Sequence, residues 1–227
     1  RSPSRGLGDV YKRQGNVVRT CMQLLMVPDA EAPNGWPTVA AFTEARRLVG
    51  DTLAEEHDVE RVVRRFFECL GPGTARDVQT WCGLTRLKPV VQAMVDRGEL
   101  VELTTWEGDD LLDLPDAQRP SGDTPAPPRF LPMWDNLLLS HADRSRVIHP
   151  SHKPFLASKN GMPPPTFLID GFVHGTWRAE LEGDEAVLRL TPFLRIPGAS
   201  EAPLVAEGEA LLAFLHPGAA RRTVRVA

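Results

Sequence analysis

The clearest structural pattern of the chain lies in residues 71–98, GPGTARDVQTWCGLTRLKPVVQAMVDRG. Thr74, followed three residues later by Asp77, has the spacing of a capping box, in which the two side chains satisfy backbone N–H groups at the start of a helix. The pair predicts a short helix over residues 74–81. Gly83 is placed to end it, because glycine adopts the left-handed backbone conformation found at helix C-termini.

A longer helix is predicted directly after this one, with Thr85 as its N-cap. Apolar residues recur at helical spacing, and Gly98 is the expected C-terminal glycine. Pro89 is tolerated only near the start of such a helix, where few backbone hydrogen bonds are lost. The apolar stripe consists of Leu87, Val90, Val91, Met94 and Val95.

A helix pattern precedes these two helices and a hairpin pattern follows them. In residues 57–70, HDVERVVRRFFECL, apolar side chains recur at helical spacing, and Gly71-Pro72 ends the helix. Residues 99–114, ELVELTTWEGDDLLDL, predict two short strands around the turn Glu107-Gly108-Asp109. Three helices followed by a β-hairpin is the order of a winged helix, so we expect a winged-helix domain over residues 51–116.

The rest of the chain is predicted to be rich in β-structure. Proline and polar residues mark a linker at 117–128. Residues 129–227 then contain three strand patterns, a helix over 201–215 and a closing strand over 221–226. We expect a small antiparallel β-barrel-like domain, or an antiparallel sheet, with one C-terminal helix, which makes the whole chain α+β. The three strands are joined by two reversing turns, Asp170-Gly171 and Gly183-Asp184.

The first fourteen residues are expected to be foreign to the natural protein. Residues 9–14, DVYKRQ, are what a transposon end used to prepare DNA sequencing libraries encodes. We therefore leave residues 1–14 out of the fold prediction; the alternative is a flexible basic N-terminal arm. Residues 15–50 are interpreted as the end of an upstream module and a linker, because a strand-like run precedes a turn-rich one.

The charge balance limits how the chain can meet nucleic acid. Its 26 Lys and Arg residues against 30 Asp and Glu residues give a formal net charge of −4 at pH 7. Indiscriminate coating of nucleic acid depends on clustered cations, so any contact with DNA must be local.

Other site types find little support in the sequence. The three cysteines lack Cys-x-x-Cys spacing, so neither a disulfide framework nor a zinc site is predicted. We also find no nucleophile elbow, phosphate-binding glycine loop or dinucleotide fingerprint, and we expect no cofactor. No apolar run approaches the length of a membrane span, so we expect a cytoplasmic protein without a membrane partner.

The helix predicted after Thr85 carries the first candidate DNA contacts. In a winged helix this element enters the major groove. Thr85, Arg86 and Lys88 lie at its start, and Gln92 lies four residues after Lys88 on the same side. Arg and Gln can pair with base edges, and Lys can hold a phosphate. The alternative is that these are ordinary solvated residues.

The predicted hairpin is acidic and would repel phosphates, so we expect it to face solvent or the basic part of the second domain. Winged helices also act as protein-interaction modules, and an acidic hairpin is compatible with that role. The carboxylates are Glu99, Glu102, Glu107, Asp109, Asp110, Asp113 and Asp116.

The second candidate contact is the basic stretch 131–159, which could follow a nucleic-acid backbone. Asp135 could instead form a structural ion pair with Arg144 or Arg146. No metal site is predicted, because the three histidines of the stretch have no regular helical spacing. Its notable residues are Trp134, Asp135, Arg144, Arg146, Lys153 and Lys159, with His141, His149 and His152.

Three runs together resemble a known family. GPGTARDVQTWCGL, LPMWDNLLLSHADRSRVI and IDGFVHGTWRAEL are similar to winged-helix DNA-binding domain-containing proteins related to bacterial DNA glycosylases that unhook interstrand crosslinks. The resemblance covers about residues 50–216. It implies tandem winged helices closed by a β-barrel, with double-stranded DNA, damaged or intact, as partner. This chain would then be the C-terminal part. The resemblance gives Trp134, Asp135, Arg144 and Arg146 a role in DNA binding, either by touching DNA or by bracing the domain.

The resemblance assigns no catalytic residue to this chain. Active members place a Gln-x-Gln or Gln-x-Asp pair in their N-terminal part, and no glutamine after residue 14 has Gln or Asp two positions later. The pair is either upstream or was never present in this member. Two hypotheses therefore remain: a DNA-binding part of a repair protein, or a non-catalytic regulator-like or protein-interaction module. The glutamines are Gln23, Gln79, Gln92 and Gln118.

Overall fold

The computed structural model divides the chain into two compact units, Arg1–His57 and Asp58–Ala227. In the first unit, strands β1 (Leu24–Met26) and β2 (Phe42–Glu44) pair antiparallel, and helix α2 (Ala45–Val49) follows directly. Residues 1–14, interpreted above as foreign, lie outside the described part. The structure describes residues 22–31, 35, 39–50, 58–105, 107–156 and 161–227.

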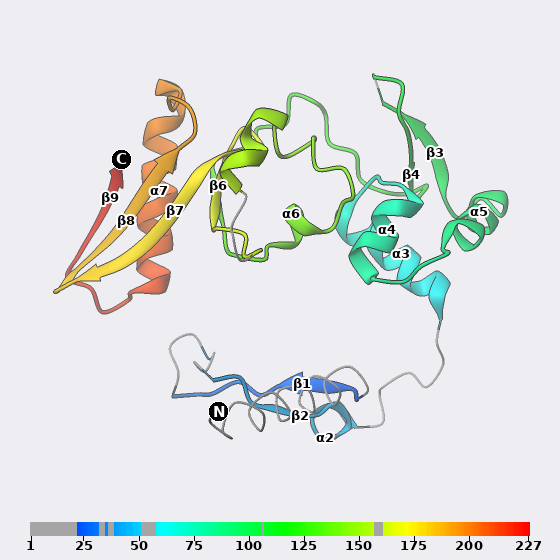
Figure 1. Cartoon of the computed structure of the whole chain (residues 1–227), viewed down its shortest axis with the longest axis horizontal. Coiled ribbons are helices and arrows are strands. Elements are labelled where there is room, and N and C mark those ends of the chain that lie inside the picture. The colour runs from blue at the N-terminus through cyan, green and yellow to red at the C-terminus, as the bar shows by residue number, and fades with distance from the viewer. Residues whose placement is uncertain (1–21, 32–34, 36–38, 51–57, 106, 157–160) are drawn as a thin grey trace, which may run out of the picture. The chain divides into compact units, whose positions relative to one another are not determined.

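The second unit begins with three helices and a hairpin, in the predicted order (Figure 1). Phe66 and Phe67 on α3 pack edge to face, with ring centroids 5.2 Å apart, and Met94 on α5 is fully buried in the same core. Gly73 exchanges two backbone hydrogen bonds with Leu112 and so adds a bridge to the hairpin. The elements are α3 (Val59–Leu70), α4 (Ala75–Cys82), α5 (Lys88–Asp96), β3 (Val101–Thr104) and β4 (Asp110–Asp113).

One predicted boundary in this region was wrong: Thr85 is not the N-cap of α5. The helix begins at Lys88, with Leu87 at the cap position and no side-chain cap. A start at Arg86 would have put Pro89 inside the first hydrogen-bonded turn, whereas the observed start leaves it at a position that lacks a backbone partner anyway. The predicted capping box of α4 is confirmed, with Thr74 and Asp77 bonded reciprocally.

The C-terminal part of this unit is a five-stranded sheet in the order β5-β6-β7-β8-β9. Helix α7 (Gly198–Leu215) packs on it through buried Leu204 and Leu212 (Figure 1). None of the helices in the described ranges is long and apolar enough to cross a membrane. The strands are β5 (Arg129–Leu131), β6 (Thr166–Ile169), β7 (Phe172–Glu182), β8 (Glu185–Pro192) and β9 (Arg221–Val226).

The predicted antiparallel barrel was wrong in two respects. Across the described strands, β5 and β9 are the two ends of the sheet and do not pair with each other, so the sheet is open. Strand β9 also runs parallel to β8. The cause is α7, which lies between them in the chain and returns it along the sheet, as a crossover helix does between parallel strands. The α+β class is confirmed.

A long connection between β5 and β6 carries the basic stretch. It holds helix α6 (Asn136–Leu139) and a 3₁₀-helix, η3 (Pro150–Leu156). Val147 and Ile148, between these helices, are buried with Leu168 and Val173 of the sheet. The backbone N–H of Val173 donates to the carbonyl of Val147, with 2.8 Å between the nitrogen and the oxygen. The connection is therefore packed on the sheet rather than looped into solvent.

Gly175 is where β7 crosses the core most closely. A Cβ at this position would lie 2.4 Å from the ring of Phe167 and 2.5 Å from the carbonyl oxygen of Thr191. The register between β6 and β7 also shifts next to this point, between Phe167 and Leu168. The sheet therefore depends on the absence of a side chain here.

We predict that Gly175→Ala lowers the free energy of unfolding by about 1–3 kcal/mol, the usual cost of overpacking a core. Urea denaturation followed by near-ultraviolet circular dichroism measures this loss. Gly218→Ala is the matched control, because Gly218 has open space at its Cβ and no positive φ. Equal midpoints for the two variants would contradict the steric explanation.

Candidate nucleic-acid interface

A side chain of α4 fixes the turn between α4 and α5. The Oε1 atom of Gln79 accepts a hydrogen bond from the backbone N–H of Leu87, with 2.9 Å between oxygen and nitrogen. Gly83 has a left-handed backbone that lets the chain reverse after α4. Gln79 thus fixes where α5 begins, a role that its spacing in the sequence did not reveal.

The four candidate residues around the start of α5 are all exposed. Thr85 and Arg86 lie in the turn rather than on the helix, and Arg86 has a φ of 61°, which is unusual for a residue with a side chain. Lys88 is the first residue of α5. Gln92 already donates its side-chain amide to Asp96, with a separation of 3.0 Å. The structure therefore leaves Arg86 and Lys88 as the freer groups.

Arg76 is a cation that the sequence interpretation missed. It lies in the first turn of α4, is exposed, and has no carboxylate within ion-pair distance among the described residues. Arg86 and Lys88 are likewise without such a partner. In the sequence, Arg76 is one of several polar residues of a short predicted helix, and no pattern distinguishes it from an ordinary solvated side chain.

The basic stretch is anchored to α4 by a buried carboxylate, Asp77. One oxygen, Oδ2, accepts from the backbone N–H and the hydroxyl of Thr74, at 2.7 and 2.8 Å. The other, Oδ1, accepts from the backbone N–H of Ala142, at 2.7 Å, across 65 positions of sequence. Asp77 is only 4% exposed. The capping box of α4 therefore also anchors the connection between β5 and β6.

Two further contacts close this junction. His141 is buried, with its ring edge against Phe66 of α3 at a centroid distance of 5.6 Å. Arg146 donates from Nη1 to the carbonyl oxygen of Pro72, at 2.7 Å. Burial lowers the pKa of His141, and the nearby positive charge of Arg146 lowers it further, although Asp77 opposes both effects. The junction therefore favours a neutral imidazole.

The proposed ion pair of Asp135 with Arg144 or Arg146 is replaced by backbone contacts. Asp135 caps α6 by accepting from the N–H of Leu137, and Arg144 donates to the carbonyl oxygen of Leu138 at 3.1 Å. Both arginines thus brace the connection with part of their guanidinium groups. They remain exposed, so their other donors are open to solvent.

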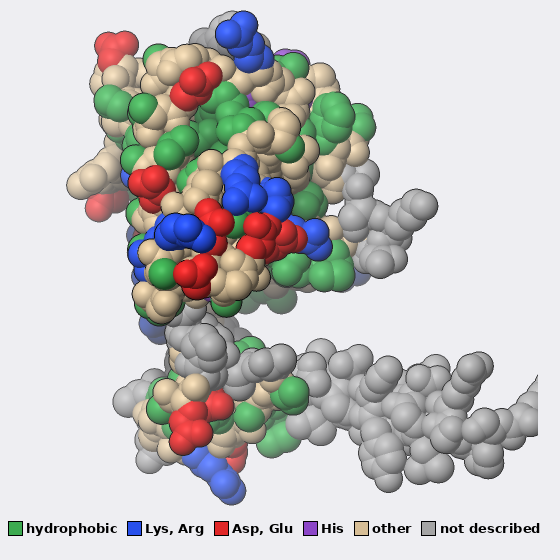
Figure 2. Space-filling model, turned by 90° about the vertical axis from the view of Figure 1, so that its left-hand side faces the viewer, with side chains coloured by type: hydrophobic (Ala, Val, Ile, Leu, Met, Phe, Trp, Pro, Cys, Tyr) green, Lys and Arg blue, Asp and Glu red, His purple; other side chains and the backbone are tan. Residues whose placement is uncertain are grey.

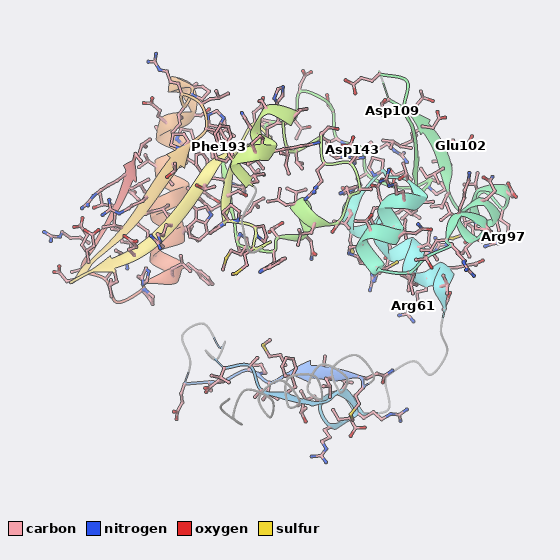
Figure 3. The ribbon with its side chains drawn as sticks, viewed as in Figure 1. Arg61, Arg97, Glu102, Asp109, Asp143 and Phe193 are labelled. Atoms are coloured by element: carbon pink, nitrogen blue, oxygen red, sulfur yellow. The ribbon has the colours of Figure 1, made fainter. Side chains whose placement is uncertain are left out.

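Trp134 and Lys153 are also exposed. Trp134 is 54% exposed and has a φ of 64°, a strained conformation for a bulky residue. Lys153 lies on η3 and is exposed. Asp143 lies near enough to Lys153 and Arg146 that both help to lower its pKa, after the larger effect of its hydrogen bonds from Ser145 (Figure 3).

The other charged surfaces of the second unit are either acidic or carry arginines that mostly pair with neighbouring carboxylates. On the sheet, Arg178, Arg189, Arg221 and Arg225 pair with carboxylates of β7, β8 and the turn between them, and Figure 2 shows the two charge types interleaved there. The hairpin carries the exposed acids Glu102 and Asp109 (Figure 3). By contrast, several exposed cations of the helices and of the connection between β5 and β6 form no such ion pair among the described residues.

Comparison with known proteins now decides the family. A protein-family model described as DNA glycosylase AlkZ-like matches residues 3–214. The chain belongs to this family. A search of curated proteins found no match. Among solved structures, Streptomyces sahachiroi DNA glycosylase AlkZ is similar, with a TM-score of 0.64 and 22% sequence identity over 90% of this chain. The match covers 54% of that protein, so this chain spans about half of its length.

In this AlkZ-like chain, the three histidines of the basic stretch do not form one cluster, although the ring centroids of His149 and His152 lie 5.6 Å apart. His141 packs on α3, whereas the Nδ1 atom of His152 lies 2.9 Å from the carbonyl oxygen of Val173. His149 contacts the hydroxyl of Ser151. Within the described ranges, no group of three or more His, Cys, Asp or Glu residues could hold a metal ion.

We predict that Asp77→Ala lowers the free energy of unfolding by about 2–4 kcal/mol, because it leaves buried donors of the AlkZ-like fold without an acceptor. Urea denaturation measures the loss. Asp58→Ala is the matched control: Asp58 caps α3 through a single bond to Arg61, at 2.9 Å, but is exposed. It should cost only about 1 kcal/mol. Equal losses would show that Asp77 is no more than a helix cap.

The lowered pKa of His141 predicts that stability falls on acidification. The unfolded chain takes up a proton near pH 6.5, whereas the folded chain resists it, so the unfolded state binds more protons and stability decreases as pH falls below about 6.5. His141→Phe keeps an aromatic ring against Phe66 and should flatten the pH dependence of the urea midpoint between pH 7.5 and 5.5. His149→Gln, at an exposed ring, should keep the wild-type dependence. An unchanged slope in His141→Phe would refute the assignment.

Proposed function

We propose that this AlkZ-like chain binds double-stranded DNA through the surface formed by α4 and the start of α5. The observation that carries the proposal is the set of exposed cations without carboxylate partners among the described residues, Arg76, Arg86 and Lys88. Most arginines on the sheet are neutralised by neighbours, so they offer little net attraction to phosphates. A local cationic surface is also what a chain with a net charge of −4 requires.

The order of elements supports a winged-helix assignment for residues 58–116. Three helices precede the hairpin, and the bridge between Gly73 and Leu112 adds the short third strand that such a hairpin sheet can carry. In this assignment α5 enters the major groove, with Arg86 and Lys88 at its leading end. The acids of the hairpin keep that element away from the phosphates, so the duplex would lie on the helical side.

The connection between β5 and β6 would supply a second set of contacts. Lys153 and the open guanidinium donors of Arg144 and Arg146 would meet the backbone, while their bonds to Leu138 and Pro72 hold the arginines in place. Asp77 ties this connection to α4, so the two sets of cations are presented by one rigid junction. Trp134 would add an exposed aromatic face.

Membership of the AlkZ-like family supports a role in DNA repair, and damaged duplex is the substrate class that the family name indicates. We assign no catalytic residue to this chain, because no glutamine after residue 14 has the Gln-x-Gln or Gln-x-Asp spacing. The competing hypothesis is a regulator-like or protein-interaction module, favoured by the exposed carboxylates of the hairpin. DNA binding that depends on the helices but not on the hairpin would argue against it.

We predict that Arg86→Gln combined with Lys88→Gln weakens duplex binding and reduces the slope of log K against log salt by about two units, since each lost phosphate contact removes about 0.9. Fluorescence anisotropy with a labelled duplex between 50 and 200 mM salt, a range suited to such slopes, measures both quantities. Arg65→Gln is the control, because Arg65 is exposed on α3 but paired with Glu68. A slope unchanged from wild type would overturn the assignment of α5.

A further inference from the structure

An exposed aromatic stack includes a residue near the end of the basic stretch, in η3. Phe155 of η3 stacks on Phe193, which directly follows β8 (Figure 3), with ring centroids 4.8 Å apart and planes 18° from parallel. Phe155 nevertheless remains 58% exposed. A ring that stacks on one neighbour and is more than half exposed has apolar surface open to a ligand.

The inner ring of this stack is held firmly. The backbone N–H of Phe193 donates to the carbonyl of His174, at 2.8 Å. His152 meets the ring of Phe193 edge to face at 5.4 Å, and its own Nδ1 donates to the carbonyl of Val173, since that carbonyl can only accept. His152 is 6% exposed. The platform is thus ordered before any ligand arrives, which lowers the entropic cost of binding.

The charge around the stack suits a phosphate-bearing ligand. Lys153 lies two residues before Phe155, and Arg195 lies two residues after Phe193. Both are exposed, and neither has a carboxylate within ion-pair distance in the part of the chain that the structure describes. Two acidic groups lie in the vicinity: Asp143, whose pKa is lowered in part by the charge of Lys153, and Glu201, which lines the same hollow as Arg195. Each aromatic residue therefore has an unpaired cation two positions away in the sequence.

We propose that the open face of Phe155 binds an unstacked nucleobase of a DNA strand, with Lys153 and Arg195 holding the adjoining phosphates. Every base has a π-face, so stacking on an aromatic ring works without sequence preference. Cations that alternate with aromatic rings are the usual composition of sites for unpaired strands. The inference deepens the proposed function and rests on it, because it adds a contact for a base that has left the duplex.

The test uses the full chain and two probes: a single-stranded oligonucleotide containing 2-aminopurine, and a duplex with one unpaired 2-aminopurine. Stacking on an aromatic ring quenches the fluorescence of this base analogue. Phe155→Leu keeps apolar bulk but removes the ring, and we expect it to abolish the quenching and weaken binding of both probes about fivefold or more. The salt slope should stay as in wild type, because no phosphate contact is lost.

Phe155→Trp should restore the quenching, since it restores a stacking face. Phe214→Leu is the matched control, because Phe214 is an exposed phenylalanine, 63% accessible, on α7. If the Phe155→Leu variant quenches the probe as strongly as wild type and still binds duplex, this inference is overturned and the proposed function stands. The stack would then be assigned to an apolar protein contact. If the wild-type chain binds neither probe nor a fully paired duplex, the proposed function and this inference both fall.

Discussion

The side chain of Asp77 sets the geometry on which the second unit depends. Its two oxygens accept from donors that belong to different parts of the fold, the start of α4 and the connection between β5 and β6. A buried carboxylate is tolerated only when its lone pairs are satisfied, so this residue demands that both partners be in place at once. The helices and the sheet are thus joined by a directional polar contact rather than by apolar packing alone.

The junction also explains how an acidic chain can present cationic surfaces. The arginines of β7, β8 and β9 use their charge to hold the sheet together, since nearly all of them lie beside a glutamate or aspartate. In the described ranges, Arg76 and Arg86 on the helical side and the arginines of the connection have no acidic partner, whereas Arg64, Arg65 and Arg97 are paired with glutamates. Coulomb attraction for a polyanion is therefore strongest where these unpaired cations lie.

Much of the helical region could be predicted from sequence because its signals are local. The capping box of Thr74 and Asp77, the glycines after α3, α4 and α5, and the turn at Gly108 each act within a few residues. The start of α5 was misplaced because Pro89 and the bond from Leu87 to Gln79 outweighed the capping preference of Thr85. The parallel pairing of β9 could not be predicted, since it depends on how α7 packs across the sheet.

The candidate site was only partly accessible to the same reasoning. Composition drew attention to Arg144, Arg146 and Lys153, but it could not tell a guanidinium that braces a backbone carbonyl from one that is free. Composition also gave no reason to select Arg76, which is a candidate because no carboxylate lies within ion-pair distance of it among the described residues. The hydrogen bond from the backbone N–H of Ala142 to Asp77 spans 65 positions, and no periodic pattern in the sequence predicts a contact of that range.

The parallel pairing of β9 with β8 has a consequence for folding. Glu185 opposes Arg221, so the strand cannot find its place until the whole of α7 has formed and settled on the sheet. Contacts between distant parts of a chain are slow to form, and β9 should be among the last elements to dock. Until then the backbone of β8 is an unpaired edge, with the apolar Leu188 and Leu190 on that same strand, and such edges pair readily with other chains. The charged side chains Glu185 and Arg189 are present on β8 before β9 docks, and charges on an exposed edge strand oppose such pairing.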